Sequence, residues 1–115
     1  MSNSLGAVLR EYRRAAGLSQ RELAKRTGLD FSYISKIENG RLPPPAADTI
    51  VLICQAMEIP AEELLALTGK IPSEVQQTVS TSKVAQEFLR EAQQMELTDE
   101  DWKQMVESLR KLRGQ

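Results

Sequence analysis

The sequence has 115 residues, enough for one small domain and an appendage, and its single cysteine, Cys54, excludes an internal disulfide. It has no histidine, which excludes histidine-based catalytic triads and histidine-ligated metal sites, and we expect no enzymatic activity, cofactor or metal. It also has no apolar run near the ~20 residues of a membrane span, so we expect a cytoplasmic protein. The net charge of −1 conceals a polarity, because residues 1–45 hold eight basic and four acidic residues (+4) and residues 46–115 hold seven and twelve (−5), so phosphates should be attracted to the N-terminal part.

The first expected helix covers residues 5–16. Leu5, Val8, Leu9 and Tyr12 fall on one side of it at helical spacing, and Gly17 ends it. This pattern predicts an amphipathic helix packed against a core.

Two short helices follow, separated by Gly28 in a left-handed turn. Ser19 and Glu22 form a Ser-x-x-Glu capping box at the start of the first helix, whose inward residues are Leu23 and Ala24. In the second, Asp30 is the expected N-cap, Ile34 and Ile37 are the expected buried pair, and the helix stops at Asn39-Gly40. The residues left toward the outside or the rim are Phe31, Ser32, Tyr33, Ser35 and Lys36. Two short helices joined by a glycine turn are typical of a helix-turn-helix.

Two further helices are expected near residues 46–58 and 60–69, after a triple proline that cannot continue a helix. Asp48 or a neighbour should open the fourth helix, and Pro60 should occupy the first position of the fifth, which buries Leu64 and Leu65. The inward face of the fourth helix is expected to comprise Ile50, Ile53, Cys54 and Met57. In that setting the thiol is a small hydrophobic group rather than a redox sensor.

Residues 70–82 form a polar linker, in which Ser73 and Gln76 suggest a capping box for a short helix from Ser73 to Val79. A helix of about residues 83–95 follows, with Val84, Ala85, Phe88, Ala92 and Met95 on one side. The last helix, about residues 99–112, is capped by Thr98 and Asp101, and its stripe is Trp102, Met105, Val106, Leu109 and Leu112. The acidic run at its start favours the helix dipole over a metal site. The short joint predicts a helical hairpin, too small to stand alone, that packs on the first domain or on another chain.

SQRELAKRTGL followed by SYISKIENGR resembles the Cro/C1-type (Xre) helix-turn-helix family of bacterial and phage repressors. The similarity extends upstream through LREYRRAAGLSQ and downstream through ICQAMEIPAEELL, and covers about residues 4–69. The resemblance implies an all-α fold, with a five-helix lambda-repressor-like DNA-binding domain at residues 1–69. It also implies a sequence-specific transcriptional regulator that binds operator DNA as a dimer or higher oligomer, and among regulators it favours a repressor.

The resemblance further implies which residues meet DNA. The second motif helix should enter the major groove with Phe31, Ser32 and Lys36 as base contacts and Tyr33 and Ser35 as secondary ones. Phe31 departs from the polar residue usual in the family, so it covers a thymine methyl or is half-buried. The expected phosphate contacts are Gln20, Asn39 and Arg41, with Arg10, Arg14 and Lys25 as further candidates. Arg13 and Glu38 match a structural ion pair of the family, although Arg13 facing DNA is the alternative.

The tail, residues 83–115, resembles the multimerisation hairpin of Sin-type repressors. Its expected oligomerisation residues are Val84, Phe88, Trp102, Met105, Val106 and Leu109. Two alternatives stay open: an antitoxin whose tail binds a toxin, and a protein-interaction adaptor that keeps the fold without using DNA.

Overall fold

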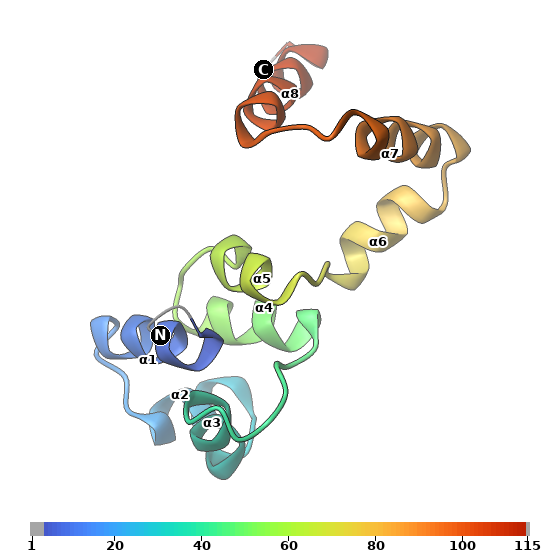
Figure 1. Ribbon diagram of the computed structural model, residues 1–115. Coiled ribbons are helices and arrows are strands. Elements are labelled where there is room, and N and C mark those ends of the chain that lie inside the picture. The colour runs from blue at the N-terminus through green and yellow to red at the C-terminus, as the bar shows by residue number, and fades with distance from the viewer. Residues whose placement is uncertain (1–3, 115) are drawn as a thin grey trace. The chain divides into compact units, whose positions relative to one another are not determined.

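The computed structural model describes residues 4–114, and within them every regular element is a helix, which confirms the expected all-α fold. The helices in chain order are α1 Leu5–Ala15, α2 Gln20–Thr27, α3 Phe31–Glu38, α4 Ala47–Ala56, α5 Glu62–Thr68, α6 Ser73–Ser80, α7 Lys83–Met95 and α8 Asp99–Leu112 (Figure 1). The chain divides into two compact units, Met1–Gln76 and Gln77–Gln115. None of the described helices is long and apolar enough to cross a membrane.

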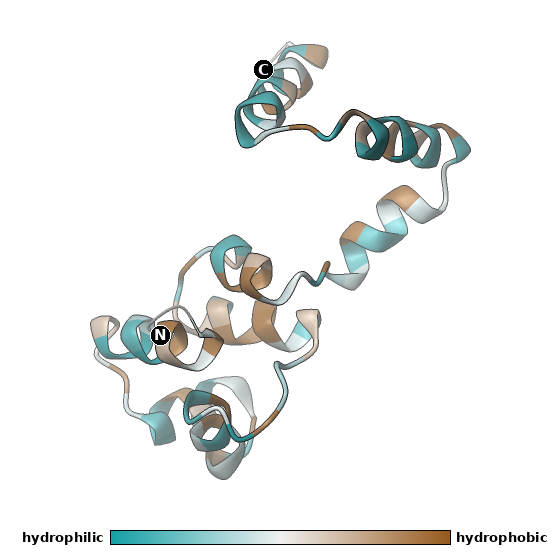
Figure 2. Cartoon of the chain, in the orientation of Figure 1, coloured by the Kyte–Doolittle hydropathy of each residue, from teal (hydrophilic) through white to brown (hydrophobic). Residues whose placement is uncertain are grey.

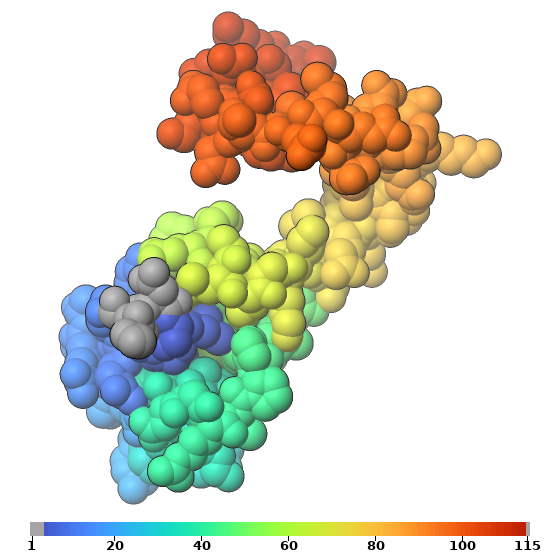
Figure 3. Space-filling view, in the orientation of Figure 1, coloured from blue at the N-terminus to red at the C-terminus, as the bar shows by residue number. Residues whose placement is uncertain are grey.

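The first unit is built from α1 to α5 around one aliphatic core. α3 packs on α1 and α2, α4 packs on α2, and α5 packs on α1 and α4. Apolar residues concentrate on α4 and α5 in Figure 2, and Figure 3 shows side chains closing the spaces between the ribbons. The largest fully buried side chains are Leu9, Leu23, Ile34, Ile50, Ile53, Leu64 and Cys54. All four residues expected on the inner face of α4 are buried, whereas Leu65 is only half-buried.

Local sequence signals mark both ends of α2 and the start of α3. The Ser19 hydroxyl accepts a hydrogen bond from the Glu22 N–H, and Gly28 adopts φ 75°, as expected for the cap and the turn. The Glu22 carboxylate, expected to complete a capping box, lies 3.8 Å from Nε of Arg26 one turn along. Asp30 is the N-cap of α3, but its side chain makes no capping bond and instead accepts one from the Ser32 hydroxyl.

The start of α4 agrees with the sequence prediction, and the start of α5 does not. Ala46, a neighbour of Asp48, is the N-cap of α4, whereas α5 begins at Glu62 after Ala61, two residues beyond the predicted Pro60. Asp48 has a tertiary role instead: its carboxylate accepts hydrogen bonds from Ser73 N at 3.0 Å and Ser73 Oγ at 2.5 Å. These two bonds lower the pKa of Asp48.

The predicted linker contains α6. The predicted capping box between Ser73 and Gln76 is wrong, since Ser73 bonds to Asp48 and the Gln76 side chain donates to the Ile71 carbonyl at 2.9 Å. Lys70 Nζ donates to the Pro44 and Pro45 carbonyls at 3.2 and 3.0 Å. The start of the expected linker is therefore held to the first unit. The domain limits 1–69, 70–82 and 83–115 stay a prediction.

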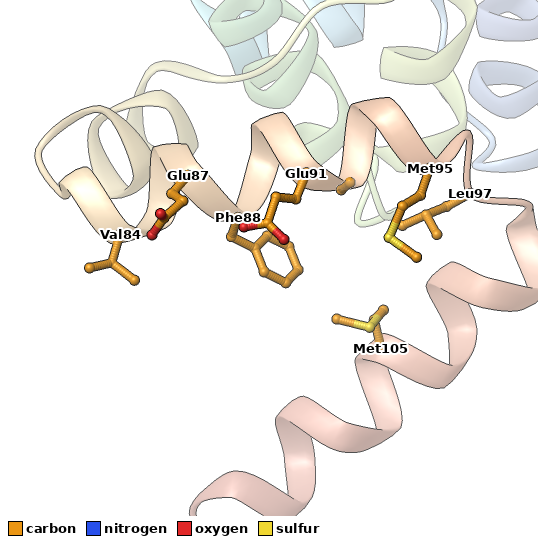
Figure 4. Close-up of a pocket in the computed structure, with 8 residues that line it drawn as sticks. Val84, Glu87, Phe88, Glu91, Met95, Leu97 and Met105 are labelled. Carbon is orange, nitrogen blue, oxygen red and sulfur yellow. The ribbon is translucent and has the colours of Figure 1, made fainter.

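The second unit contains α7 and α8, at the predicted positions. Thr98 and Asp101 form a reciprocal capping box at the start of α8, with bonds of 3.0 and 3.1 Å, as the sequence indicated. At the joint, Glu96 takes φ 50°, a left-handed conformation in which glycine is more usual. Figure 4 shows Met105 of α8 across an open hollow from Phe88 and Met95 of α7. The hollow has a volume of about 330 Å³, so the two helices leave apolar surface uncovered.

One glycine decides how α1 meets α3. Gly6 is buried, and a Cβ at this position would lie 2.5 Å from the Ile37 carbonyl oxygen and 2.6 Å from that of Glu38. Backbone atoms cannot yield as a flexible side chain can. Glycine is therefore required here by the close approach of the two helices, a requirement that the sequence pattern did not reveal.

Candidate nucleic-acid interface

The outer face of α3 is defined by what the helix buries. Ile34 and Ile37 are 0% and 3% exposed and fix the helix on α1 and α2. Ser32 and Lys36 are exposed on the opposite side, and Tyr33 and Ser35 are half-buried beside them. The structure thus brings the expected base contacts together on one face of one helix, but their contact with bases stays a prediction.

Phe31 stands at the first position of α3 and is half-buried against the core. The guanidinium carbon of Arg21, from the first turn of α2, lies 4.4 Å from the centre of its ring. This is a cation–π arrangement, which orders a positive charge beside the N-terminus of α3. Arg21 was not among the predicted DNA contacts. Its position just after the cap of α2 and the aromatic start of α3 were the signals that could have found it.

Glu38 is the centre of a buried charge cluster that joins α1, α2 and α3. Its side chain is 0% exposed, and its carboxylate accepts from Arg13 Nε at 2.6 Å and Arg13 Nη2 at 2.9 Å. Arg13 also donates to the Leu18 carbonyl at 2.8 Å. Burial alone would raise the pKa of Glu38, but hydrogen bonds from Arg13, Gln20 and Arg10 outweigh it and lower the pKa. Arg13 therefore faces the core rather than the surface, in the ion pair that the resemblance implied.

Two expected phosphate contacts belong to the same cluster. Gln20 Nε2 donates to Glu38 Oε1 at 3.0 Å. Arg10 donates through Nε to Glu38 Oε1 at 3.3 Å and through Nη2 to Asn39 Oδ1 at 2.8 Å, and its side chain is 34% exposed. Neither side chain is free in this structure. A phosphate contact by either one stays a prediction, and Arg10 gains a second role as the residue that orients the Asn39 amide.

The end of α3 places Asn39 and Arg41. Gly40 has φ 71°, its N–H donates to the Ile37 carbonyl, and the Arg41 N–H donates to the Lys36 carbonyl. These two bonds form a Schellman motif, which fixes the backbone just beyond the helix. Asn39 and Arg41 are both exposed there. Two groups able to donate to a phosphate are thus held beside the outer face of α3.

A family model described as a helix-turn-helix domain matches residues 4–67, which span α1 to α5. The chain belongs to this helix-turn-helix family. The helix-turn-helix family expected from the sequence is therefore confirmed.

Relatives of this helix-turn-helix chain carry the names of regulators. The chain is 39% identical over 75 residues to the uncharacterized HTH-type transcriptional regulator RghRB of Bacillus subtilis (strain 168), covering 63% of this chain and 54% of that protein. It is 37% identical over 68 residues to the HTH-type transcriptional repressor RghR of the same organism, covering 59% and 50%. The match thus spans about half the length of these curated relatives.

A solved structure shares the fold. The hypothetical transcription factor NHTF from Neisseria is 30% identical, with a TM-score of 0.50 over 69% of this chain and 82% of that one.

The remaining expected site residues are exposed to solvent. Arg14 and Lys25 are exposed on α1 and α2, and their surroundings within the described residues assign neither of them a role. The six expected oligomerisation residues are also exposed, from 37% for Met105 to 73% for Val84. Their role stays a prediction. Among residues 4–114, no group of three or more acidic or cysteine side chains is placed to hold a metal ion.

Cys54 is buried in this helix-turn-helix core. The residue is 1% exposed, and burial together with the charge of Glu62 raises the pKa of its thiol to about 11. A neutral, buried thiol is a poor nucleophile and fits a packing role.

Proposed function

We propose that this protein is a sequence-specific DNA-binding transcriptional regulator that acts as a repressor by occupying promoter DNA. The observation that carries the proposal is the outer face of α3, with Ser32 and Lys36 exposed on a helix whose other side is locked by Ile34, Ile37 and Glu38. The names of RghRB and RghR support the same function. The protein works in the cytoplasm and carries out no chemical reaction.

In this proposal α3 lies in the major groove with its N-terminal half leading. Lys36 donates to guanine O6 and N7, and Ser32 donates or accepts at a base edge. Asn39 and Arg41 contact phosphates on one side, and the Ser19-capped start of α2 presents free N–H groups to a phosphate on the other. The buried pair of Arg13 and Glu38 keeps these two sets of contacts at a fixed separation.

The acting species is proposed to be a dimer or higher oligomer, held together by the tail. One helix-turn-helix covers a few base pairs, too few to distinguish an operator from competing genomic sites. Two helix-turn-helix domains, about one turn of the DNA double helix apart, double the number of base pairs that are recognised. The exposed apolar residues of α7 and α8 support pairing, because covering them gains about 25 cal/mol per Å².

Selection of bound sequences from random DNA tests the proposal, with the mass of the complex measured alongside. We expect one enriched motif with two related half-sites, and a log K that falls steeply with log salt. Lys36→Ala should lose the preference at the base pair that Lys36 contacts, whereas Lys83→Ala, a matched change outside the helix-turn-helix, should keep the whole motif. Absence of DNA binding at low salt would refute the proposal and favour the adaptor. A toxin co-purifying through the tail would favour the antitoxin.

A further inference from the structure

One side of α8 is apolar and exposed. Trp102, Met105, Val106 and Leu109 are 42%, 37%, 44% and 66% exposed. Together with Phe88 of α7, they line a second hollow of about 450 Å³. Contiguous exposed apolar surface of this kind is typical of a protein–protein interaction site.

The charges along α8 are separated by sign. Its first turn holds Asp99, Glu100 and Asp101, and its last turn holds Arg110 and Lys111, followed by Arg113. This order stabilises the helix through its dipole. It also gives the helix an acidic end and a basic end, so the two directions in which a second helix can lie beside it are not equivalent.

The charges that flank the apolar stripe distinguish these directions. Asp99 and Arg110 are eleven residues apart, about three turns, so they flank the stripe on the same side. Asp101 flanks it on the other side. In an antiparallel pair, like flanks of two identical helices meet, and the Asp99 flank of one copy faces the Arg110 flank of the other. In a parallel pair, opposite flanks meet, and Asp99 faces Asp101.

We infer that two copies of this chain pair through α8 in antiparallel orientation, with Asp99 of each copy beside the basic last turn of the other. This inference rests on the proposed tail-mediated oligomer and adds its geometry. The pair has two-fold symmetry, with the axis crossing the middle of the apolar stripe. The first turns of the two α8 helices then lie at opposite ends of the pair, about 20 Å apart at 1.5 Å per residue.

Spin labels on the full-length protein test the orientation. Glu100→Cys and Lys111→Cys place labels on the side of α8 away from the stripe, and Cys54 is shielded from the label because it is buried, with 1% of its surface exposed. In the antiparallel pair, a label at 100 in one copy is closer to a label at 111 in the other than to a label at 100. In a parallel pair, the order of these two distances is reversed.

Charge exchange gives a second, independent measurement. Asp99→Lys and Arg110→Glu should each weaken association roughly five-fold, and the double variant should restore it. Glu107→Lys, a reversal away from the stripe, should leave association unchanged. Circular dichroism checks that each variant keeps its helix content. In a parallel pair, Asp99→Lys would instead strengthen association, since the introduced ammonium group would face Asp101.

The outcomes separate the inference from the proposed function. A dimer with the reversed order of distances, or one that the charge exchanges do not affect, overturns the antiparallel pairing alone. A chain that sediments as a monomer at about 100 times the concentration used in the DNA-binding measurement overturns the proposed oligomer as well. Specific DNA binding is measured separately: in the proposed function it needs two paired copies but no particular orientation of α8, so its loss in a chain that still dimerises would count against the proposed function alone.

Discussion

Removing the Glu38 carboxylate should destabilise the first unit much more than removing an exposed charge such as that of Glu22. Glu38→Ala leaves the Arg13 guanidinium, whose side chain is 9% exposed, with the Leu18 carbonyl as its remaining partner. Deleting one member of a buried ion pair costs about 3–5 kcal/mol. The Arg10 bond adds little, because that side chain is 34% exposed and its distance to Glu38 is 3.3 Å. We therefore expect a loss of about 3–4 kcal/mol, a large part of the ~5–15 kcal/mol of a typical domain.

Urea denaturation followed by circular dichroism measures this loss. Glu22→Ala is the matched control, because its pair with Arg26 is 3.8 Å long and about half exposed, with side-chain exposures of 48% and 45%. Such a pair is worth about 0–1 kcal/mol. Replacing both partners, Arg13→Met with Glu38→Leu, should recover most of the stability, since no buried charge remains. The reasoning fails if Glu38→Ala loses no more than Glu22→Ala, or if the double variant is the least stable of all.

Three further predictions follow from the same geometry. The pKa of Glu38 is lowered in the folded state, so its contribution to the free energy of unfolding is fully present above the unfolded pKa of about 4.5 and is lost as pH falls through the folded pKa. Glu38→Gln should therefore flatten the dependence of the unfolding free energy on pH below about 4.5. Ser32→Ala and Lys36→Ala should each cost roughly 1–3 kcal/mol on the selected operator and less on random DNA, as measured by titration of both. Arg41→Ala should weaken binding to every sequence and reduce the salt slope by about one, and an unchanged slope would remove Arg41 from the phosphate contacts.

The features predicted correctly from the sequence depend on neighbouring residues. Ser19 caps α2 and Gly28 ends it because both effects act within one helical turn. The buried pair Ile34 and Ile37 follows from helical spacing alone. These local signals were enough to place α3 and its outer face.

The missed features depend on tertiary contacts. Asp48 or a neighbour was expected to open α4, and Ala46 does so, but the bond from Asp48 to Ser73, twenty-five residues away, was missed because the residues around Asp48 gave no sign of that partner. The bond from Arg10 to Asn39 was missed because it arises from where α1 crosses the end of α3, while a phosphate contact by Arg10 stays a prediction. Pro60 was expected to begin α5, a position for which it is suited, but the helix begins after Ala61. Propensity thus indicated which residues are permitted at a helix end, and packing selected among them.

The close approach at Gly6 has a mechanical consequence. The α1 backbone rests directly on the Ile37 and Glu38 carbonyls, with no side chain between them. Side chains at such a contact can change rotamer under load, whereas touching backbones cannot. A displacement of the end of α3 on DNA binding would therefore be transmitted directly to α1, and the two helices would move together as a rigid body. The stiffness of the proposed DNA-contacting surface thus depends on Gly6, a residue that contributes no side chain to it.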